Sequence, residues 1–203
     1  MPICDGRKAL WHKDIFGLYG CGRTRKVRAL ILAHYNGAGG WVCNNWHPFL
    51  WEDAMSITEI LKGARERGQR MGLPYEGALL PHEAYELLQS APGAKLVDVR
   101  TRAEWDWVGR VPGAVEIELL TYPGSRPNPA FLAELERQVD KEALVMFICR
   151  SGGRSHNAAQ LAMQAGYTQC YNVLEGFEGD KDAAGHRNTQ GGWRARGLPW
   201  TQS

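Results

Sequence analysis

From residue 74 to the C-terminus, short apolar runs alternate with segments of helical pattern, and this alternation constrains the fold more than any other feature. Strands that alternate with helices are typical of a parallel sheet covered by those helices. The sequence therefore predicts an α/β fold with a parallel central sheet and helices on both faces. The expected strands are 95–99, 115–118, 144–148 and 169–174. The expected helices begin at Pro81, Asn128-Pro129 and Asn157, with a turn or short helix after Thr101 and a closing helical turn over 192–196.

Residues 149–155, Cys-Arg-Ser-Gly-Gly-Arg-Ser, connect the predicted strand 144–148 to the following helix. Backbone N–H groups and the dipole at a helix N-terminus favour anions and stabilise a thiolate. Ligands of open α/β sheets bind at the carboxyl ends of strands, where this cysteine lies. The segment therefore predicts a nucleophilic cysteine in an anion-binding loop, with a buried packing cysteine as the structural alternative. The expected catalytic residues are Cys149 and Arg154, and the expected anion cradle is Arg150, Ser151, Gly152, Gly153 and Ser155.

The charge of the chain gives no reason to expect a nucleic-acid or membrane partner. The net charge is +2, with +3 on residues 1–54 and −1 on the remainder. A balance this small produces no strong attraction to a polyanion or an anionic surface. The five cysteines do not resemble a disulfide framework, and no apolar run is long enough to cross a membrane. We therefore expect a cytoplasmic protein with reduced thiols.

Residues 1–54 differ from the rest of the chain because they contain tryptophans, cysteines and glycines without clear periodicity. They are predicted to be an irregular or disordered leader, and one hypothesis is that translation starts at Met55. Residues 55–73 are predicted to form a helix that begins with a capping box, Ser56 and Glu59. Among the candidate metal ligands Cys4, Cys21, Cys43 and His47, only the last two are closely spaced, so neither a metal site nor a cofactor is expected.

Several short motifs occur here in the order in which they occur in rhodaneses. They are Leu96-Val97-Asp98-Val99-Arg100 with Glu104-Trp105, Gly109-Arg110-Val111-Pro112-Gly113-Ala114, the loop 149–154, and Leu174-Glu175-Gly176-Phe177 with the later Gly192-Trp193 and Gly197-Leu198-Pro199. Residues 74–203 therefore resemble a single-domain rhodanese, a member of the thiosulfate sulfurtransferase-like family. Arg110 stands where that family usually has a histidine. The resemblance does not extend to residues 1–54.

The resemblance implies a rhodanese-like fold and a sulfur-transfer reaction. Cys149 would take a sulfane sulfur from thiosulfate or a related small anionic donor and hold it as a persulfide. A thiol, cyanide or a protein cysteine would then accept that sulfur. The resemblance also implies that Asp98 and Arg100 support the site from the end of the preceding strand, although a purely structural ion pair would explain the same two residues.

One segment departs from the family pattern. Residues 178–190 are inserted between the Gly176-Phe177 turn and Trp193. An insertion near the carboxyl ends of the strands should lie beside the active loop. The functional interpretation is a lid or a specificity loop that contains His186 and Arg187, and the structural alternative is a solvated surface loop.

Two other functions share the cysteine loop. Cysteine phosphatases and arsenate reductases also place a cysteine and an arginine at a helix N-terminus, but the phosphatase loop is longer than the four residues between Cys149 and Arg154. A shorter loop makes a smaller pocket, which suits sulfur better than phosphate. The second alternative is a persulfide carrier or binding module that acts on a protein partner.

Overall fold

The computed structural model describes residues 8–19, 23–35, 41–43 and 56–202. The chain divides into two compact units, Met1–Ala54 and Met55–Ser203. Each unit is described by itself below.

The first unit contains an antiparallel sheet with the strand order β1-β2-β3. Its strands are β1 (Lys8–Tyr19), β2 (Arg23–Tyr35) and β3 (Trp41–Cys43). These strands differ from the irregular leader that the sequence predicts. Such a ladder is held by backbone hydrogen bonds between segments, as in the pairing of Lys8 with His34, and neither segment needs a regular apolar period to form it. The remaining candidate metal ligands, Cys4, Cys21 and His47, lie outside the described residues.

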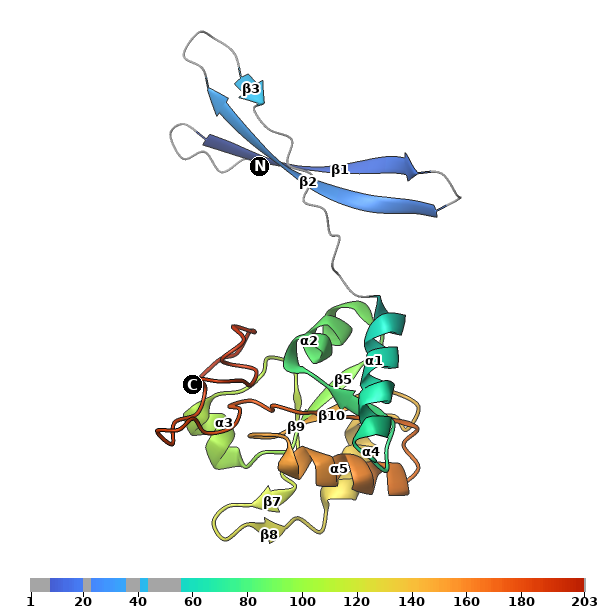
Figure 1. The fold of residues 1–203 in the computed structure, drawn as a ribbon, viewed down its shortest axis with the longest axis vertical. Helices are drawn as coiled ribbons and strands as arrows, with labels where there is room; N and C mark the ends of the chain where they lie inside the picture. The colour runs from blue at the N-terminus through green and yellow to red at the C-terminus, as the bar shows by residue number, and fades with distance from the viewer. Residues whose placement is uncertain (1–7, 20–22, 36–40, 44–55, 203) are drawn as a thin grey trace. The chain divides into compact units, whose positions relative to one another are not determined.

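The second unit is built on a five-stranded sheet with the order β4-β10-β9-β5-β6. All of its strand pairs are parallel, which confirms the predicted α/β fold. The strands are β4 (Gly77–Leu79), β5 (Lys95–Asp98), β6 (Val115–Glu116), β9 (Leu144–Ile148) and β10 (Gln169–Val173). β9 is the central strand and pairs in parallel with β5, so the carboxyl ends of these two strands lie side by side (Figure 1).

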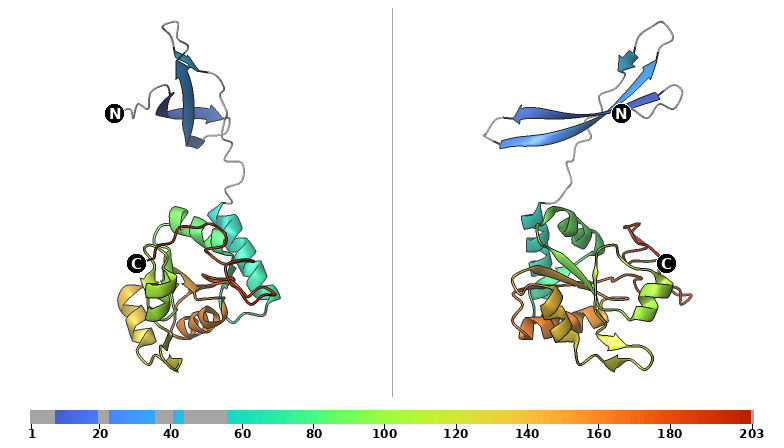
Figure 2. Two further views of the ribbon diagram at one scale, coloured as in Figure 1. Left: turned by 90° about the vertical axis from the view of Figure 1, so that its left-hand side faces the viewer. Right: turned by 180° about the vertical axis from the view of Figure 1, so that it is seen from behind.

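Helices cover both faces of this sheet, as the sequence predicts (Figures 1 and 2). The helices α1 (Ile57–Arg70) and α2 (Pro81–Ser90) contribute to one hydrophobic core, and α4 (Phe131–Gln138) and α5 (Gly153–Gln164) contribute to the other. Neighbouring strand residues alternate between the two cores, as Val145 and Met146 do in β9. No helix in residues 56–202 is long and apolar enough to cross a lipid bilayer.

Some helix boundaries that the sequence predicts are confirmed by the structure, and others are wrong. The capping box of α1 is confirmed, since the side chains of Ser56 and Glu59 each accept the other's backbone N–H. However, α4 begins at Phe131, because Asn128 Oδ1 accepts the N–H of Ala130 before the helix starts. Over residues 192–196 the structure has a single turn, in which the N–H of Arg196 donates to the carbonyl of Gly192, and no longer helix.

Two further differences lie beside the predicted cysteine loop. The helix α5 begins at Gly153 rather than Asn157, because Gly152 adopts a left-handed conformation and ends the loop early. A small antiparallel hairpin, β7 (Leu120–Thr121) with β8 (Arg126–Pro127), was not predicted. It is too short to show the alternation by which strands are recognised. The short helix α3 (Arg102–Val108) follows β5, where a turn or short helix is expected.

Candidate active site

Cys149 follows the carboxyl end of β9 and faces the first turn of α5. Its Sγ atom lies 3.2 Å from the backbone N of Gly152 and 3.2 Å from Oγ of Ser155, and both groups donate to it. The residue is almost completely buried, with 1% of its surface exposed. Two donors at a helix N-terminus stabilise negative charge on the sulfur.

The loop conformation depends on glycine at position 152. Gly152 has φ +94°, and a Cβ atom there would lie 2.1 Å from the carbonyl oxygen of Leu174. Its own carbonyl accepts a hydrogen bond from Nδ2 of Asn172 and lies 3.1 Å from Oγ of Ser155, which shares its one proton between this carbonyl and Sγ. Any side chain would therefore displace the N–H group that contacts Sγ.

A second turn holds the other side of the loop. The N–H of Phe177 donates to the carbonyl of Cys149 at 2.8 Å, and the N–H of Glu178 donates to that of Arg150 at 2.9 Å. A Cβ atom on Gly176 would lie 2.5 Å from the Cys149 carbonyl oxygen, so this turn also needs glycine. The inserted segment 178–190 therefore begins in direct contact with the loop, as expected for an insertion beside the active site.

Arg154 is held by an acid that sequence reasoning did not assign to the site. Nη1 and Nη2 of Arg154 lie 2.7 and 2.6 Å from the two carboxylate oxygens of Glu104. Burial by itself would raise the pKa of Glu104, but the bonds from Arg154 and from Thr101 lower that pKa to about 2. The signal available in the sequence is the Thr101 and Glu104 capping box at the start of α3.

A cleft of about 560 Å³ lies beside the loop. Its charged lining residues are Arg150, Arg154, Arg187, Glu104 and Glu178, and its other lining residues are Thr101, Ala103, Trp107, Val108, Leu120, Tyr122 and Ser125. The structure thus brings Arg187 of the inserted segment together with the two arginines of the loop. His186 is exposed and does not line the cleft, and neither does the buried Cys149.

The remaining residues of the predicted anion cradle contribute less directly. Ser151 is half-buried and Gly153 is exposed. Within residues 56–202, the donors to Cys149 Sγ are the Gly152 N–H and the Ser155 hydroxyl, and the N–H groups of Arg150, Ser151 and Gly153 do not bond to it. The role of the other backbone N–H groups of the loop in holding a bound anion stays a prediction, because the contacts of Sγ itself do not test it.

Asp98 and Arg100 form a fully buried ion pair with a shortest N–O distance of 2.6 Å. The Arg100 guanidinium also donates to the carbonyl of Gly109 and lies 3.9 Å from the ring centroid of Phe177. Because the N–H of Phe177 bonds to Cys149, this pair reaches the loop through one intervening residue. Neither residue lines the cleft, so their contact with the site is indirect.

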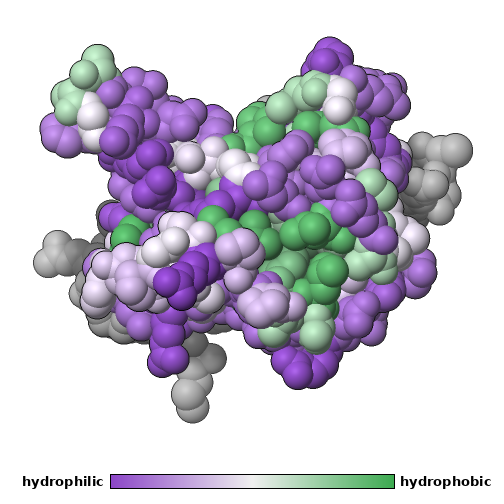
Figure 3. Space-filling model, turned by 90° about the horizontal axis from the view of Figure 1, so that it is seen from below, coloured by the Kyte–Doolittle hydropathy of each residue, from purple (hydrophilic) through white to green (hydrophobic). Residues whose placement is uncertain are grey.

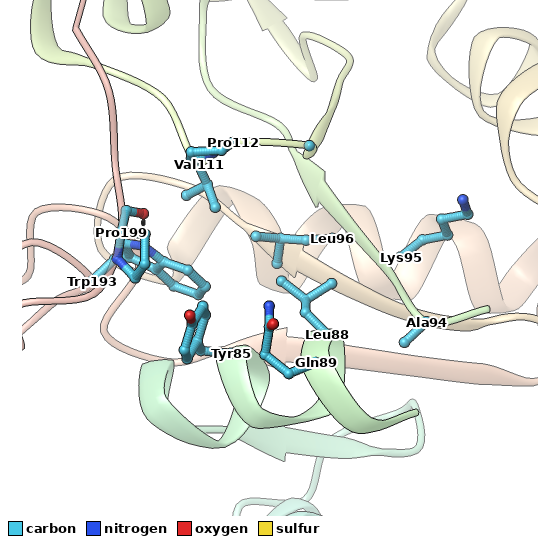
Figure 4. Close-up of a pocket in the computed structure, with 11 residues that line it drawn as sticks. Tyr85, Leu88, Gln89, Ala94, Lys95, Leu96, Val111, Pro112, Trp193 and Pro199 are labelled. Atoms are coloured by element: carbon cyan, nitrogen blue, oxygen red, sulfur yellow. Dashed lines mark hydrogen bonds between the residues drawn. The ribbon is translucent and has the colours of Figure 1, made fainter. Parts of the chain in front are cut away.

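A second cavity, of about 360 Å³, lies at the other end of the sheet, beside the start of β5 (Figure 4). Tyr85 and Trp193 meet edge to face in its lining, with ring centroids 5.9 Å apart. Lys95 is its one ionised lining side chain. This cavity therefore has no cysteine, histidine or carboxylate in its lining. Within residues 56–202, no three side chains of His, Cys, Asp or Glu are grouped as metal ligands.

Comparison with known proteins agrees with this geometry. The sequence model of the Rhodanese-like domain family matches residues 80–183. An uncharacterized protein of Rickettsia conorii is 38% identical over 120 residues, which cover 58% of this chain and 91% of that protein. A thiosulfate sulfurtransferase, GlpE of Actinobacillus pleuropneumoniae, is 31% identical over 125 residues, which cover 59% of this chain and 87% of that enzyme.

A solved structure supports the same assignment. The crystal structure of Rv0390 from Mycobacterium tuberculosis superimposes with a TM-score of 0.59 at 47% identity, covering 64% of this chain and 99% of that one. The cysteine loop and the match to the family at residues 80–183 both lie in the second unit. On these grounds, the chain belongs to the rhodanese-like domain family.

Proposed function

We propose that this protein is a sulfurtransferase that carries sulfane sulfur as a persulfide on Cys149. The observation that carries the proposal is the position of Sγ between the Gly152 N–H and the Ser155 hydroxyl, at the N-terminus of α5. These donors would stabilise both the attacking thiolate and the terminal sulfur of a persulfide. The 31% identity to a thiosulfate sulfurtransferase supports the same reaction.

In the first half-reaction, the Cys149 thiolate attacks the outer sulfur of thiosulfate. A new S–S bond forms to Cys149, the original S–S bond breaks, and sulfite leaves with the electron pair of that bond. In the second half-reaction, cyanide or a thiolate attacks the outer sulfur of the persulfide, and Cys149 leaves as the thiolate. This sequence is ping-pong covalent catalysis, and it consumes no oxidant or reductant.

The arginines of the cleft would have different roles. The exposed Arg150 makes no ion pair within residues 56–202, so its guanidinium is available for the oxyanion of a donor. Arg154 is already bound to Glu104 by two hydrogen bonds and would chiefly hold the loop in place. Arg187 is half-buried, donates to the carbonyl of Gly179 and lines the same cleft.

The test is intact-mass spectrometry of the protein after incubation with thiosulfate. The wild-type protein should gain the mass of one sulfur atom and lose it when cyanide is added, whereas Cys149→Ala should gain nothing. Cys170→Ala is the matched control and should gain and lose sulfur like the wild type. Cys170 is also buried, but burial raises the pKa of its thiol to about 12. A wild-type protein that is alkylated at Cys149 but gains no sulfur would contradict the proposal.

A further inference from the structure

The cleft beside Cys149 has an exposed aromatic wall that the transfer of sulfur between small ions does not require. Within residues 56–202, four large hydrophobic side chains are exposed: Met71, Trp107, Tyr122 and Leu161. Trp107, at 70% exposure, and Tyr122, at 64%, both line this cleft. Large exposed aromatic side chains that gather at one site indicate a surface for binding another molecule.

Two separate elements build this wall. Trp107 belongs to α3, and its carbonyl accepts a hydrogen bond from Gln202 Nε2 at 2.7 Å. Tyr122 lies in the connection of the β7–β8 hairpin, next to Leu120 and Thr121. Both rings are more than half exposed, so neither closes a hydrophobic core. The face of the molecule shown in Figure 3 is mainly hydrophilic, with hydrophobic residues gathered in patches.

The lining of the cleft is also cationic. Arg150 and Arg187 have no carboxylate partner within residues 56–202, and Glu104 is neutralised by Arg154. Glu178 is the remaining acid of the cleft, so two guanidinium groups face one carboxylate. This balance favours a ligand with negative charge. Trp, Tyr and Arg are also the residue types that contribute most to binding at protein interfaces.

The size of the cleft also points beyond an inorganic anion. Its volume of about 560 Å³ is in the range that holds a drug-sized or peptide-sized ligand. Thiosulfate and cyanide are far smaller and have no apolar surface to place against Trp107 and Tyr122. The sulfur acceptor is the second substrate, and the proposed reaction allows it to be a small thiol or a thiol on a large molecule.

We propose that this cleft binds a cysteine-bearing segment of a partner protein, with an apolar residue against Trp107 and Tyr122 and an acidic residue beside Arg150 and Arg187. The inference rests on the proposed function and names its acceptor. The partner's thiolate attacks the outer sulfur of the Cys149 persulfide, the S–S bond to Cys149 breaks, and Cys149 leaves as the thiolate. The partner cysteine becomes the persulfide, and no other reactant is needed.

The kinetic test uses two synthetic octapeptides, each with one central cysteine, flanked by Phe and Glu in one and by Gly and Lys in the other. Persulfide-loaded protein should transfer sulfur to the acidic aromatic peptide about tenfold faster than to the basic one. Trp107→Ala should lower the ratio of the acidic-peptide rate to the cyanide rate about tenfold. Met71→Ala, which removes a side chain that is 51% exposed away from the cleft, should leave that ratio unchanged.

A binding test separates this inference from the proposed function. Cys149→Ala is titrated with the same peptides carrying serine in place of cysteine, so no sulfur transfer is needed. Tighter binding of the acidic aromatic peptide that is lost in Cys149→Ala/Trp107→Ala supports the docking surface, even if thiosulfate loads no sulfur. Equal binding of both peptides, or equal transfer rates to both peptides and to free cysteine, would overturn the inference.

Discussion

Arg154 and Glu104 form a two-bond ion pair that joins the first turn of α5 to the first turn of α3. The two side chains are 20% and 18% exposed, so the pair is largely removed from water. One of its members belongs to the cysteine loop, and the other is the capping acid of a neighbouring helix. The pair therefore fixes one wall of the cleft relative to Cys149.

The ion pair predicts a specific dependence of stability on pH. The folded-state pKa of Glu104, about 2, lies below its ordinary value of 4.5, so the pair stabilises the fold above that ordinary value. The ionised carboxylate, held by Arg154 and Thr101 together, contributes about 3 kcal/mol at pH 7, and this should be lost as the pH falls from about 5 to about 2. Urea unfolding of the wild type and of Glu104→Gln should differ by this amount at pH 7 and converge in acid.

The control for this prediction is Glu136→Gln. Glu136 pairs with Lys141 at 2.9 Å, but both side chains are nearly half exposed. Its removal should change the free energy of unfolding by less than about 1 kcal/mol. A difference between wild type and Glu104→Gln that stays constant from pH 7 to the acid limit would show that the charge of Glu104 is not what stabilises the fold.

Two adjacent glycines should respond in opposite ways to alanine. Gly152→Ala places a Cβ atom 2.1 Å from the Leu174 carbonyl at a positive φ, so it should destabilise the fold by about 3 kcal/mol or more. Gly153→Ala meets no atom within 4 Å in the first turn of α5 and should stabilise the fold by about 0.5 kcal/mol. Thermal unfolding of both variants checks this contrast, and equal effects would contradict it.

The Ser155 hydroxyl should raise the reactivity of Cys149. Ser155→Ala removes one of the two donors to Sγ, and a hydrogen bond to a charged group is worth about 1.5 kcal/mol. The rate of iodoacetamide alkylation of Cys149 at neutral pH should therefore fall about tenfold. Ser90→Ala is the control, since Ser90 Oγ bonds to the Glu86 carbonyl far along the chain from the loop. An unchanged alkylation rate in Ser155→Ala would mean that this hydroxyl does not stabilise the thiolate.

Replacing each of the two loop arginines by alanine should have a different effect: the Arg150 variant should bind thiosulfate more weakly, and the Arg154 variant should be less stable. Arg150→Ala removes an exposed guanidinium without an ion pair in the described part of the chain, so the free energy of unfolding should change by less than about 0.5 kcal/mol. The KM for thiosulfate should rise about tenfold, because the variant loses a charge-assisted contact. Arg154→Ala should instead destabilise the fold by about 3 kcal/mol, since it leaves Glu104 buried without its partner. Similar losses of stability in both variants would contradict this division of roles.

Predictions from the sequence succeeded where the physical cause is local. Short apolar runs such as 144–148 predict strands covered on both faces, and in the structure the neighbouring residues Val145 and Met146 do enter opposite cores. The capping box of Ser56 with Glu59 is likewise complete within four residues. The cysteine at the end of β9 and the helix after it follow from the same kind of pattern.

The contacts between side chains at the site could not be predicted from the sequence and are known only from the tertiary structure. Glu104 and Arg154 are 50 positions apart, and nothing in either segment indicates that they pair. The early start of α5 depends on Gly152 lying against the Leu174 carbonyl, which is a contact between two different connections. The exposed position of Trp107 is a further case, because an aromatic residue in a short helix is equally consistent with core packing.

The sequence by itself predicted the parallel α/β class, the strands β5, β6, β9 and β10, and the position of Cys149 after the end of β9. These follow from periodicity and from hydrogen bonds between neighbouring residues, which any short window of sequence contains. Only the tertiary structure decided which charges meet at the loop, which N–H groups reach Sγ, and which aromatic side chains remain exposed beside it. Those outcomes depend on packing between distant segments, and the free energy of such packing is not recorded in either segment alone.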